Sequence, residues 1–236
     1  MTFSITGRDA RTGMIGVAVA TRYWAVGSRV PYVRPKVAAL AVQAYAQPYL
    51  GYDTLNLMQE TGCSGPEALT QVLGRDPGRE WRQVGLVDYQ GNVMGHTGSE
   101  TVAWSGHLVG EQCVAAGNML VGPRTTVQAM VESFAQQAEL ELPDRLTLAL
   151  QAGHAAGGDK RGQQSAAVYV VYLEDAPYLD LRVDDHPDAI AELARLVQAT
   201  REDRLVRSLH FASSRESPPV SGYVTHKEEL KKVGLA

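Results

Sequence analysis

The stretch MTFSITGRDARTGMIGVAVATR, residues 1–22, contains two strand-like segments joined by a short polar turn. In the first segment, apolar Phe3 and Ile5 alternate with polar residues, as on a half-buried strand. The second segment is built of small and β-branched residues, and ARTG between the two is typical of a turn. We therefore expect a β-hairpin that begins at Thr2, directly behind the initiator methionine.

The segments that follow this hairpin alternate between groups of strands and pairs of helices. Residues 27–35 read as a loop, and the run KVAALAVQA after it is apolar on both faces, so both faces of its sheet must be covered. The order therefore predicts two packed sheets between helical layers. The remaining expected strands lie at 82–88 and 92–98, 101–106, 111–120, 165–173 and 178–183, and the helices near 53–60, from 64, over 127–138, from 143 and over 190–197.

The chain has 236 residues, which suits one large domain. We place this domain at residues 1–200. From residue 201 the composition changes, because SSRESPPVSG resembles a linker and HKEELKKVGLA a short charged helix. We expect 201–236 to be an appendage, and both docking on a neighbouring subunit and a plain disordered tail stay open for it.

Charge and cysteine content narrow the partners and the compartment. Lys and Arg total 22 against 26 Asp and Glu, and no basic run interleaved with aromatic residues is found, so we expect no nucleic-acid partner. The longest apolar run, 37–46, is far shorter than the ~20 residues of a membrane span. Without a signal-like start and with two cysteines, Cys63 and Cys113, the chain is expected in the cytoplasm, with both thiols simply packed.

Thr2 offers a nucleophile and a base within one residue once Met1 is removed. An α-amine titrates near ~7.7–8.0, so a good fraction is unprotonated at neutral pH and accepts a proton from the adjacent hydroxyl. Threonine activated by the chain's own amine is a known form of nucleophilic catalysis. It requires a rigidly held terminus, which a strand at the start of the chain provides.

Six segments in the same order resemble the family catalogued as domain of unknown function 1028: TFSITGRDARTGMIGVAVATRYWAVGS, VQAYAQPYLGYDTLNLM, RQVGLVDYQGNVMGHTG, GNMLVG, AGGDKRGQQSAAVYVV and DLRVDDHPD. The resemblance extends from Thr2 to about Leu196. Because that family is grouped with the N-terminal nucleophile (Ntn) hydrolases, the resemblance implies an α+β fold, a four-layer αββα sandwich with two mainly antiparallel sheets. It also implies amide or related acyl chemistry at Thr2.

The start of the chain is also similar to proteasome-type β subunits, which begin with a threonine strand and carry a lysine on a later strand. In this chain GMIGVAVATR supplies Thr21 and Arg22, and Lys36 opens the expected third strand. Ala20 stands where those subunits have an acidic residue. Lys36 is therefore a candidate catalytic residue, and a solvated lysine at a strand end is the alternative.

The segment AGGDKRGQQS, residues 156–165, is the best candidate for a binding loop. Successive glycines expose N–H groups that suit an anion, Arg161 can grip a carboxylate at two points, and Asp159 and Ser165 complete the set of expected substrate-binding residues. From the residues alone, a helix stop followed by a turn explains the segment equally well. The family resemblance favours the functional interpretation.

Three further polar positions are candidates for the site. Gln43 and Tyr45 end the third expected strand, where donors for an oxyanion hole could lie. Asn118 in GNML is a candidate catalytic residue that contacts the oxyanion or the substrate. Each side chain could equally be a buried polar group bonded to backbone. In DLRVDDHPD we favour helix capping over metal binding, and we expect neither a metal nor a cofactor.

Two hypotheses from different classes fit these observations. In the first, the protein is an Ntn hydrolase that cleaves an amide of a small metabolite, with any substrate carboxylate held by Arg22 or Arg161. In the second, it is a non-catalytic small-molecule-binding protein on the same fold. Ala20, in place of the acidic residue of proteasome-type subunits, would then reflect the loss of catalysis. We expect a homo-oligomer in both cases, because sheet sandwiches of this kind commonly assemble.

Overall fold

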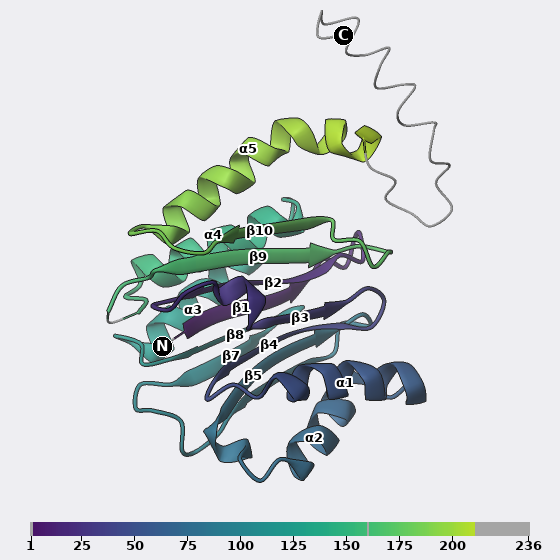
Figure 1. Ribbon diagram of the computed structural model, residues 1–236, viewed down its shortest axis with the longest axis vertical. Coiled ribbons are helices and arrows are strands. Elements are labelled where there is room, and N and C mark those ends of the chain that lie inside the picture. The colour runs from purple at the N-terminus through teal and green to yellow at the C-terminus, as the bar shows by residue number, and fades with distance from the viewer. Residues whose placement is uncertain (1, 160, 211–236) are drawn as a thin grey trace, which may run out of the picture.

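The computed structural model describes residues 2–159 and 161–210 (Figure 1). Its strands are β1 (Thr2–Arg8), β2 (Ile15–Thr21), β3 (Pro31–Arg34), β4 (Ala38–Ala44), β5 (Arg82–Asp88), β6 (Val93–Thr97), β7 (Gly106–Gly110), β8 (Cys113–Asn118), β9 (Ser165–Val171) and β10 (Leu179–Val183). Its α-helices are α1 (Pro48–Thr61), α2 (Gly65–Arg75), α3 (Pro123–Gln136), α4 (Leu142–Ala155) and α5 (Ala189–His210). Short 3₁₀ turns cover Val26–Ser28 and Arg79–Trp81.

The strands form two antiparallel sheets that pack face to face. Sheet A has six strands in the order β10-β9-β2-β1-β8-β7, and sheet B has four in the order β3-β4-β5-β6. Helices α3, α4 and α5 cover the outer face of sheet A, and α1 and α2 cover that of sheet B (Figure 1). The α+β fold and the four-layer αββα sandwich expected from the sequence are thereby confirmed.

Strand β1 lies in the interior of sheet A, and its alternation decides which residues face the second sheet. Phe3 and Ile5 are fully buried in a cluster with side chains of α3, α4 and α5. The intervening positions point the other way, as the hydroxyl of Thr6 shows by donating to the carbonyl of Gly85 on β5 over 3.4 Å. Because side chains alternate with a period of two, Thr2 also belongs to the face between the sheets.

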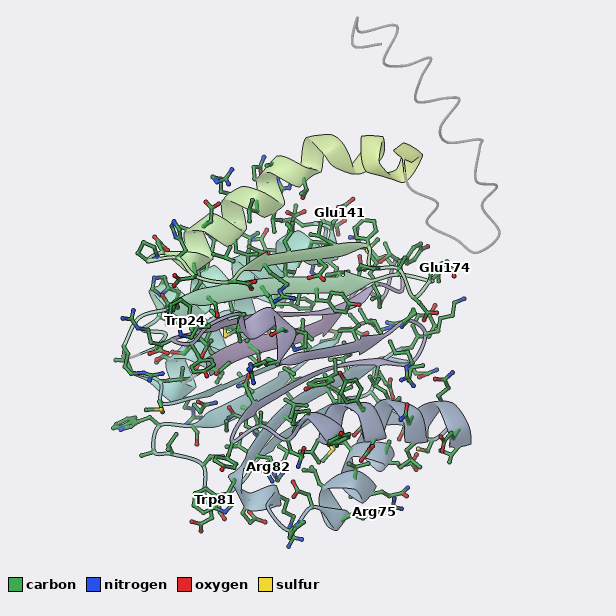
Figure 2. All side chains as sticks on the ribbon, in the orientation of Figure 1. Trp24, Arg75, Trp81, Arg82, Glu141 and Glu174 are labelled. Atoms are coloured by element: carbon green, nitrogen blue, oxygen red, sulfur yellow. The ribbon has the colours of Figure 1, made fainter. Side chains whose placement is uncertain are left out.

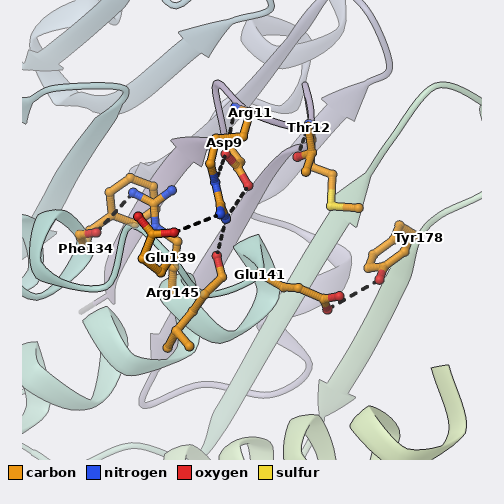
Figure 3. A network of polar contacts seen from close by, with 10 residues as sticks. Asp9, Arg11, Thr12, Phe134, Glu139, Glu141, Arg145 and Tyr178 are labelled. Carbon is orange, nitrogen blue, oxygen red and sulfur yellow. Dashed lines mark hydrogen bonds and ion pairs between the residues drawn. The ribbon is translucent and has the colours of Figure 1, made fainter. Parts of the chain in front are cut away.

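The end of β1 away from Thr2 is fastened by ionic contacts (Figure 3). The carboxylate of Asp9 accepts hydrogen bonds from the backbone N–H of Arg11 at 2.9 Å and from its guanidinium at 3.3 Å. The same guanidinium donates to the carbonyl of Leu140 at 3.1 Å, in the connection between α3 and α4. Buried Arg145 donates to the carbonyl of Phe134 at 3.1 Å and lies over its ring. These contacts hold the β1–β2 turn against the helical layer.

Several local predictions are confirmed. Ser64 and Glu67 form a capping box at the start of α2, and β5 and β6 form a hairpin in which Gly91 takes a φ of +96°. In the segment DLRVDDHPD, for which helix capping was favoured over metal binding, the carboxylate of Asp188 accepts from the N–H of Ala191 at 3.2 Å. Asp188 therefore caps the start of α5.

Other local predictions are wrong. Part of the expected 27–35 loop is strand β3, because Tyr32 of β3 packs with the apolar residues of β4 and α1. Helix α1 begins at Pro48, before the expected 53, because the side chain of Gln47 caps it. The expected strand at 101–106 is irregular up to residue 105, and the strand that pairs with β8 is β7.

Helix α5 continues to His210, across the expected domain boundary at residue 200. Arg201 of this helix donates to the carboxylate of Asp144 on α4 at 2.9 Å, which ties the two helices together. The rest of the expected appendage, 211–236, lies outside the described residues. Among the helices that the structure describes, none has both the length and the apolar character required to cross a membrane.

Candidate functional site

The space between the two sheets ends in a layer of polar side chains at the Thr2 end of β1. On sheet A, strand register places four polar residues in one row: Ser165, Thr21, Thr2 and Asn118. On sheet B, a second row contains Gln43, Gln83 and Thr97. Deeper in this space most inward side chains are apolar, such as Val17 and Ala41, and β1 adds the buried hydroxyls of Ser4 and Thr6. The polar layer at the Thr2 end, where polar side chains of both sheets meet, is therefore the candidate site.

Thr2 is half-buried and has hydrogen-bond partners on both neighbouring strands. Its backbone nitrogen donates to Oδ1 of Asn118 on β8 at 3.1 Å. Its hydroxyl lies 3.0 Å from the hydroxyl of Thr21 on β2, and either oxygen can be the donor. The backbone nitrogen of Thr2 is thus held by an amide oxygen on one side, and its hydroxyl by another hydroxyl on the other side.

Asn118 is buried and connects Thr2 to the second sheet. Its Nδ2 donates to Oε1 of Gln83 on β5 at 3.1 Å, and the same oxygen accepts from Nε2 of Gln43 on β4 at 2.8 Å. Of these residues, sequence reasoning missed Gln83. The signal was present, because Gln83 shares one face of β5 with Gly85 and Val87, which have no polar side chain, and it pairs with Gln43 of β4.

The 156–165 loop approaches the site beside Asn118. Asp159 forms an isolated antiparallel bridge with Leu120, two residues after Asn118. Its carboxylate is fully buried, Oδ1 accepts from the N–H of Arg161 at 2.6 Å, and Oδ2 finds no hydrogen-bond partner among the described residues. Burial raises the pKa of the Asp159 carboxyl, against the opposing effect of Arg161 and of the positive amino terminus.

Two arginines lie along this loop. Arg161 is half-exposed, and its guanidinium lies 3.7 Å from the carboxylate of Asp159. Arg22 is exposed at the end of β2, and a Cβ atom built on Gly162 would lie 3.8 Å from its Nη1. The N–H of Gln164 donates to the carbonyl of Thr21 at 2.7 Å, which fixes the loop against β2. Both cations therefore lie beside the 156–165 loop, and Arg22 directly follows Thr21, the strand partner of Thr2.

Lys36 does not belong to this site, which corrects the expectation drawn from the proteasome-like pattern. It lies in the turn before β4, whereas Gln43, near the far end of β4, reaches the Thr2 end through Gln83. At about 3.3 Å per residue, the distance along the strand exceeds 15 Å, beyond the reach of a lysine side chain. Lys36 instead lines an open pocket together with Gln90 and Asn92, at the opposite end of the sandwich.

Tyr45 and Gln43 make hydrogen bonds within the fold. The backbone N–H of Tyr45 donates to the carbonyl of Trp81 at 3.3 Å, so it is not available for an oxyanion. Its carbonyl accepts at 2.6 Å from Arg82, which is labelled in Figure 2, and the carboxylate of Asp76 accepts from the same guanidinium at 2.8 Å. The side chain of Gln43 is buried, its Nε2 donates to Gln83, and its Oε1 has no hydrogen-bond partner among the described residues, so its contact with substrate stays a prediction.

Ser165 is part of the polar row, yet its hydroxyl is fully committed. It donates to the carbonyl of Tyr23 at 2.6 Å and accepts from the N–H of Val26 at 3.1 Å. The residue is buried and fixes the loop that follows β2, which carries the exposed Trp24 (Figure 2). The hydroxyl proton of Ser165 is thus already used within the fold, and its role in substrate binding stays a prediction.

Positive backbone φ angles occur at both ends of the sandwich among the described non-glycine residues. Ala44 at the end of β4, Met119 directly after Asn118 and Trp104, whose carbonyl accepts from Leu120, have a φ between 55° and 68° near the polar layer. Lys36 and Gln112 have a φ of 60° and 59° at the opposite end. This conformation is uncommon for non-glycine residues, but its distribution does not distinguish the two ends.

The fold and the site together define the class of protein by architecture alone: an αββα sandwich with a threonine at the start of an interior strand of its six-stranded sheet. The chain belongs to the family of unknown function DUF1028, whose model matches residues 2–193. The resemblance seen in the sequence is thereby confirmed.

One solved structure similar to this chain is that of protein SPO2555 from Silicibacter pomeroyi, of the same family. It is 35% identical, with 84% of this chain and 85% of that chain covered and a TM-score of 0.77. A weaker likeness is to Anbu (ancestral beta-subunit) from Yersinia bercovieri, which is 11% identical, with 87% of this chain and 97% of that chain covered and a TM-score of 0.37. Another is to Anbu from Hyphomicrobium sp. strain MC1, which is 8% identical, with 91% of this chain and 100% of that chain covered and a TM-score of 0.39. No curated protein matches the chain.

Proposed function

We propose that this protein is an N-terminal nucleophile hydrolase that cleaves an amide bond of a small metabolite, with Thr2 as the nucleophile after removal of Met1. The observation that carries the proposal is the pair of contacts made by Thr2, from its nitrogen to Asn118 and from its hydroxyl to Thr21. They hold the amine and the hydroxyl of one residue at the edge of a buried polar layer, which is the geometry that self-activation requires.

The reaction would proceed in two steps. Oγ1 of Thr2 attacks the amide carbon of the substrate, the C–O bond forms, and the hydroxyl proton passes to the α-amine. The C–N bond then breaks, and the amine returns this proton to the departing nitrogen. Water hydrolyses the resulting ester, with the amine again as base, and restores Thr2.

The charges around the site suggest the substrate class. Arg22 and Arg161 flank the 156–165 loop and are exposed or half-exposed, so either guanidinium can bind a carboxylate from solvent at two points. Asp159, buried with one oxygen unpartnered among the described residues, suits an N–H group of the substrate or of the Thr2 amine. A small amide that bears a carboxylate matches this combination.

The proposal is tested by mass spectrometry. The intact mass of protein from its own host shows whether Met1 is removed, and treatment with a hydroxyl-reactive acylating agent should place one adduct on Thr2. Thr2→Val, which keeps the shape and loses the hydroxyl, is the matched control and should carry none. A retained Met1, or a Met1-free protein without the adduct, contradicts the proposal.

A non-catalytic binding protein is the second candidate, and one observation favours it. Ala20 stands where proteasome-type subunits have an acidic residue, and Lys36 lies at the opposite end of the sandwich from Thr2. The described surroundings of Thr2 therefore lack the acidic residue and the lysine of the proteasome-like pattern. A binding protein on this fold would use the polar layer around Thr2 as its binding site and would retain Met1. The same intact-mass measurement separates the two functions.

A further inference from the structure

The side chain of Asn118 can present either of its two ends to Thr2, and the structure selects one. Oδ1 accepts from the Thr2 nitrogen at 3.1 Å while Nδ2 donates to Oε1 of Gln83 at 3.1 Å. If the amide were turned around, its oxygen would face the oxygen of Gln83, two acceptors without a proton between them. The orientation of Asn118 is therefore decided by which end Gln83 presents.

Gln83 in turn has only one satisfactory orientation. Its Nε2 lies 2.9 Å from the carbonyl of Gly117, 3.0 Å from that of Gly106 and 3.0 Å from the hydroxyl of Thr97. Two of these groups are carbonyl oxygens, which only accept, and the Thr97 hydroxyl can accept as well. The NH2 end of the Gln83 amide must therefore face them, and its oxygen must face Asn118. Gln83 is fully buried, and Gln43 donates to its oxygen as well. The amide is thus locked by both backbone and side chains.

The last contact of this chain of hydrogen bonds reaches the surface. The Thr97 hydroxyl lies 2.8 Å from Nδ1 of His107, which is exposed on β7. Partial burial of the ring, with a smaller effect of His96, lowers the pKa of His107, which favours the neutral ring. In the tautomer with the proton on Nε2, Nδ1 accepts from the Thr97 hydroxyl, and the Thr97 oxygen is then free to accept from Gln83.

The direction of these hydrogen bonds matters when the base is the α-amine of Thr2. An amine that donates to Oδ1 of Asn118 keeps its lone pair for the hydroxyl proton, whereas an amine that accepts from Nδ2 has its lone pair occupied. We propose that Gln83, on the sheet opposite Thr2, is a positioning residue that orients Asn118 and thereby keeps the Thr2 amine available as the base. This inference rests on the proposed function for its catalytic consequence, and on geometry alone for the orientation.

The experiment compares three variants of the full, Met1-free chain. Gln83→Met removes the oxygen that faces Asn118. Gln83→Glu restores it, because a buried glutamic acid stays protonated and both donates and accepts as the amide does. Thr54→Val is the control for the loss of a buried hydrogen bond, because Thr54 lies on α1, on the outer face of sheet B, and its buried hydroxyl donates to the carbonyl of Leu50.

Two readouts separate orientation from catalysis. The pKa of the Thr2 amine is measured by NMR on ¹⁵N-threonine-labelled protein, and acylation of Thr2 by p-nitrophenyl acetate is followed by mass. In Gln83→Met the amine pKa should fall by about half a unit or more, since an acceptor that favours the charged amine is lost, and acylation should slow about tenfold. Gln83→Glu and Thr54→Val should remain near the wild type in both.

The outcomes decide the two proposals separately. An unchanged amine pKa and acylation rate in Gln83→Met overturn the positioning role and leave the proposed function intact. A wild type that is never acylated overturns the proposed function, and the NMR titration still decides the orientation. If Gln83→Met does not fold, neutron diffraction of the wild type reads the amide directly, and deuterons on the Asn118 atom that faces Thr2 would overturn the inference.

Discussion

The backbone nitrogen of Thr2 donates to the side-chain oxygen of Asn118 over 3.1 Å, across 116 positions of sequence. The contact exists because β1 and β8 are antiparallel neighbours whose register places the first residue of one strand opposite the last of the other. A chain start held in this way has lost the freedom that termini normally keep. Its rigidity is what a nucleophile and base on one residue need.

Replacement of Thr21 by valine should slow acylation of Thr2 about three- to tenfold. The Thr21 hydroxyl lies 3.0 Å from that of Thr2, and one hydrogen bond of ordinary strength accounts for an effect of this size. The acylation rate of Met1-free protein measures it, with circular dichroism as the check on folding. A rate equal to that of the wild type would show that the Thr2 hydroxyl does not depend on Thr21.

The sequence was sufficient for most of the fold and for part of the site. Alternation in β1 and the double apolar face of β4 predicted the hairpin and the covered sheets, because both depend on spacing within one segment. The contact between Asn118 and Thr2 also involves residues that the sequence singled out. Their pairing, however, is set by the register of β1 and β8, which no local pattern contains.

The errors share one physical cause, which is the placement of residues along a strand. Lys36 and Gln43 belong to the same apolar run, and the sequence did not reveal that only the end with Gln43 lies near Thr2. Gln83 was passed over because it is adjacent to Thr2 only across the space between the sheets. Contacts between sheets follow from how the layers stack, and stacking is not encoded in any one strand.

Asp159→Asn should leave the protein at least as stable at neutral pH while weakening the site. Burial raises the pKa of this carboxyl, so between the unfolded and the folded pKa the native state binds more protons, and stability falls as the pH rises through that range. Asparagine keeps the acceptor for the Arg161 N–H and removes the buried charge. We expect a gain of about 0.5–2 kcal/mol in unfolding free energy at neutral pH, together with slower acylation of Thr2.

Urea denaturation and the acylation assay check this prediction, with Asp185→Asn, an exposed acid of the β10–α5 connection, as the control. Loss of more than about 1 kcal/mol on replacement of Asp159 would make it a structural anchor, since that is the scale of a broken buried hydrogen bond. An unchanged acylation rate would separate it from the site.

The two cysteines should differ sharply in reactivity. Burial raises the pKa of the Cys113 thiol to about 12, and its side chain is enclosed below β7 and α3. Cys63 is partly exposed at the end of α1. Iodoacetamide at neutral pH should modify Cys63 alone in the native protein and both thiols in urea, which peptide mass mapping resolves. Modification of native Cys113 at a comparable rate would show that this part of sheet A opens readily.

Asp9→Asn should lower stability at neutral pH and flatten its loss in acid. Burial raises the pKa of Asp9, yet the hydrogen bonds and charge of Arg11, with a smaller effect of Arg145, outweigh it, so the folded pKa lies below the usual value of an aspartic acid. A depressed pKa contributes stability that is complete above the unfolded pKa and is lost as the pH falls through the folded one. The wild type should therefore lose this contribution below about pH 4.

The variant keeps one acceptor for the Arg11 N–H but loses the charge that faces its guanidinium, so we expect a cost of about 1–3 kcal/mol at neutral pH. Thermal unfolding of both proteins from neutral pH to about pH 3 measures the difference, which should shrink as the wild-type carboxylate is protonated. Glu139→Gln is the control, because that carboxylate is almost fully exposed and its contact with Arg11 is worth little. Parallel pH profiles for Asp9→Asn and the wild type would contradict the assignment of acid sensitivity to this turn.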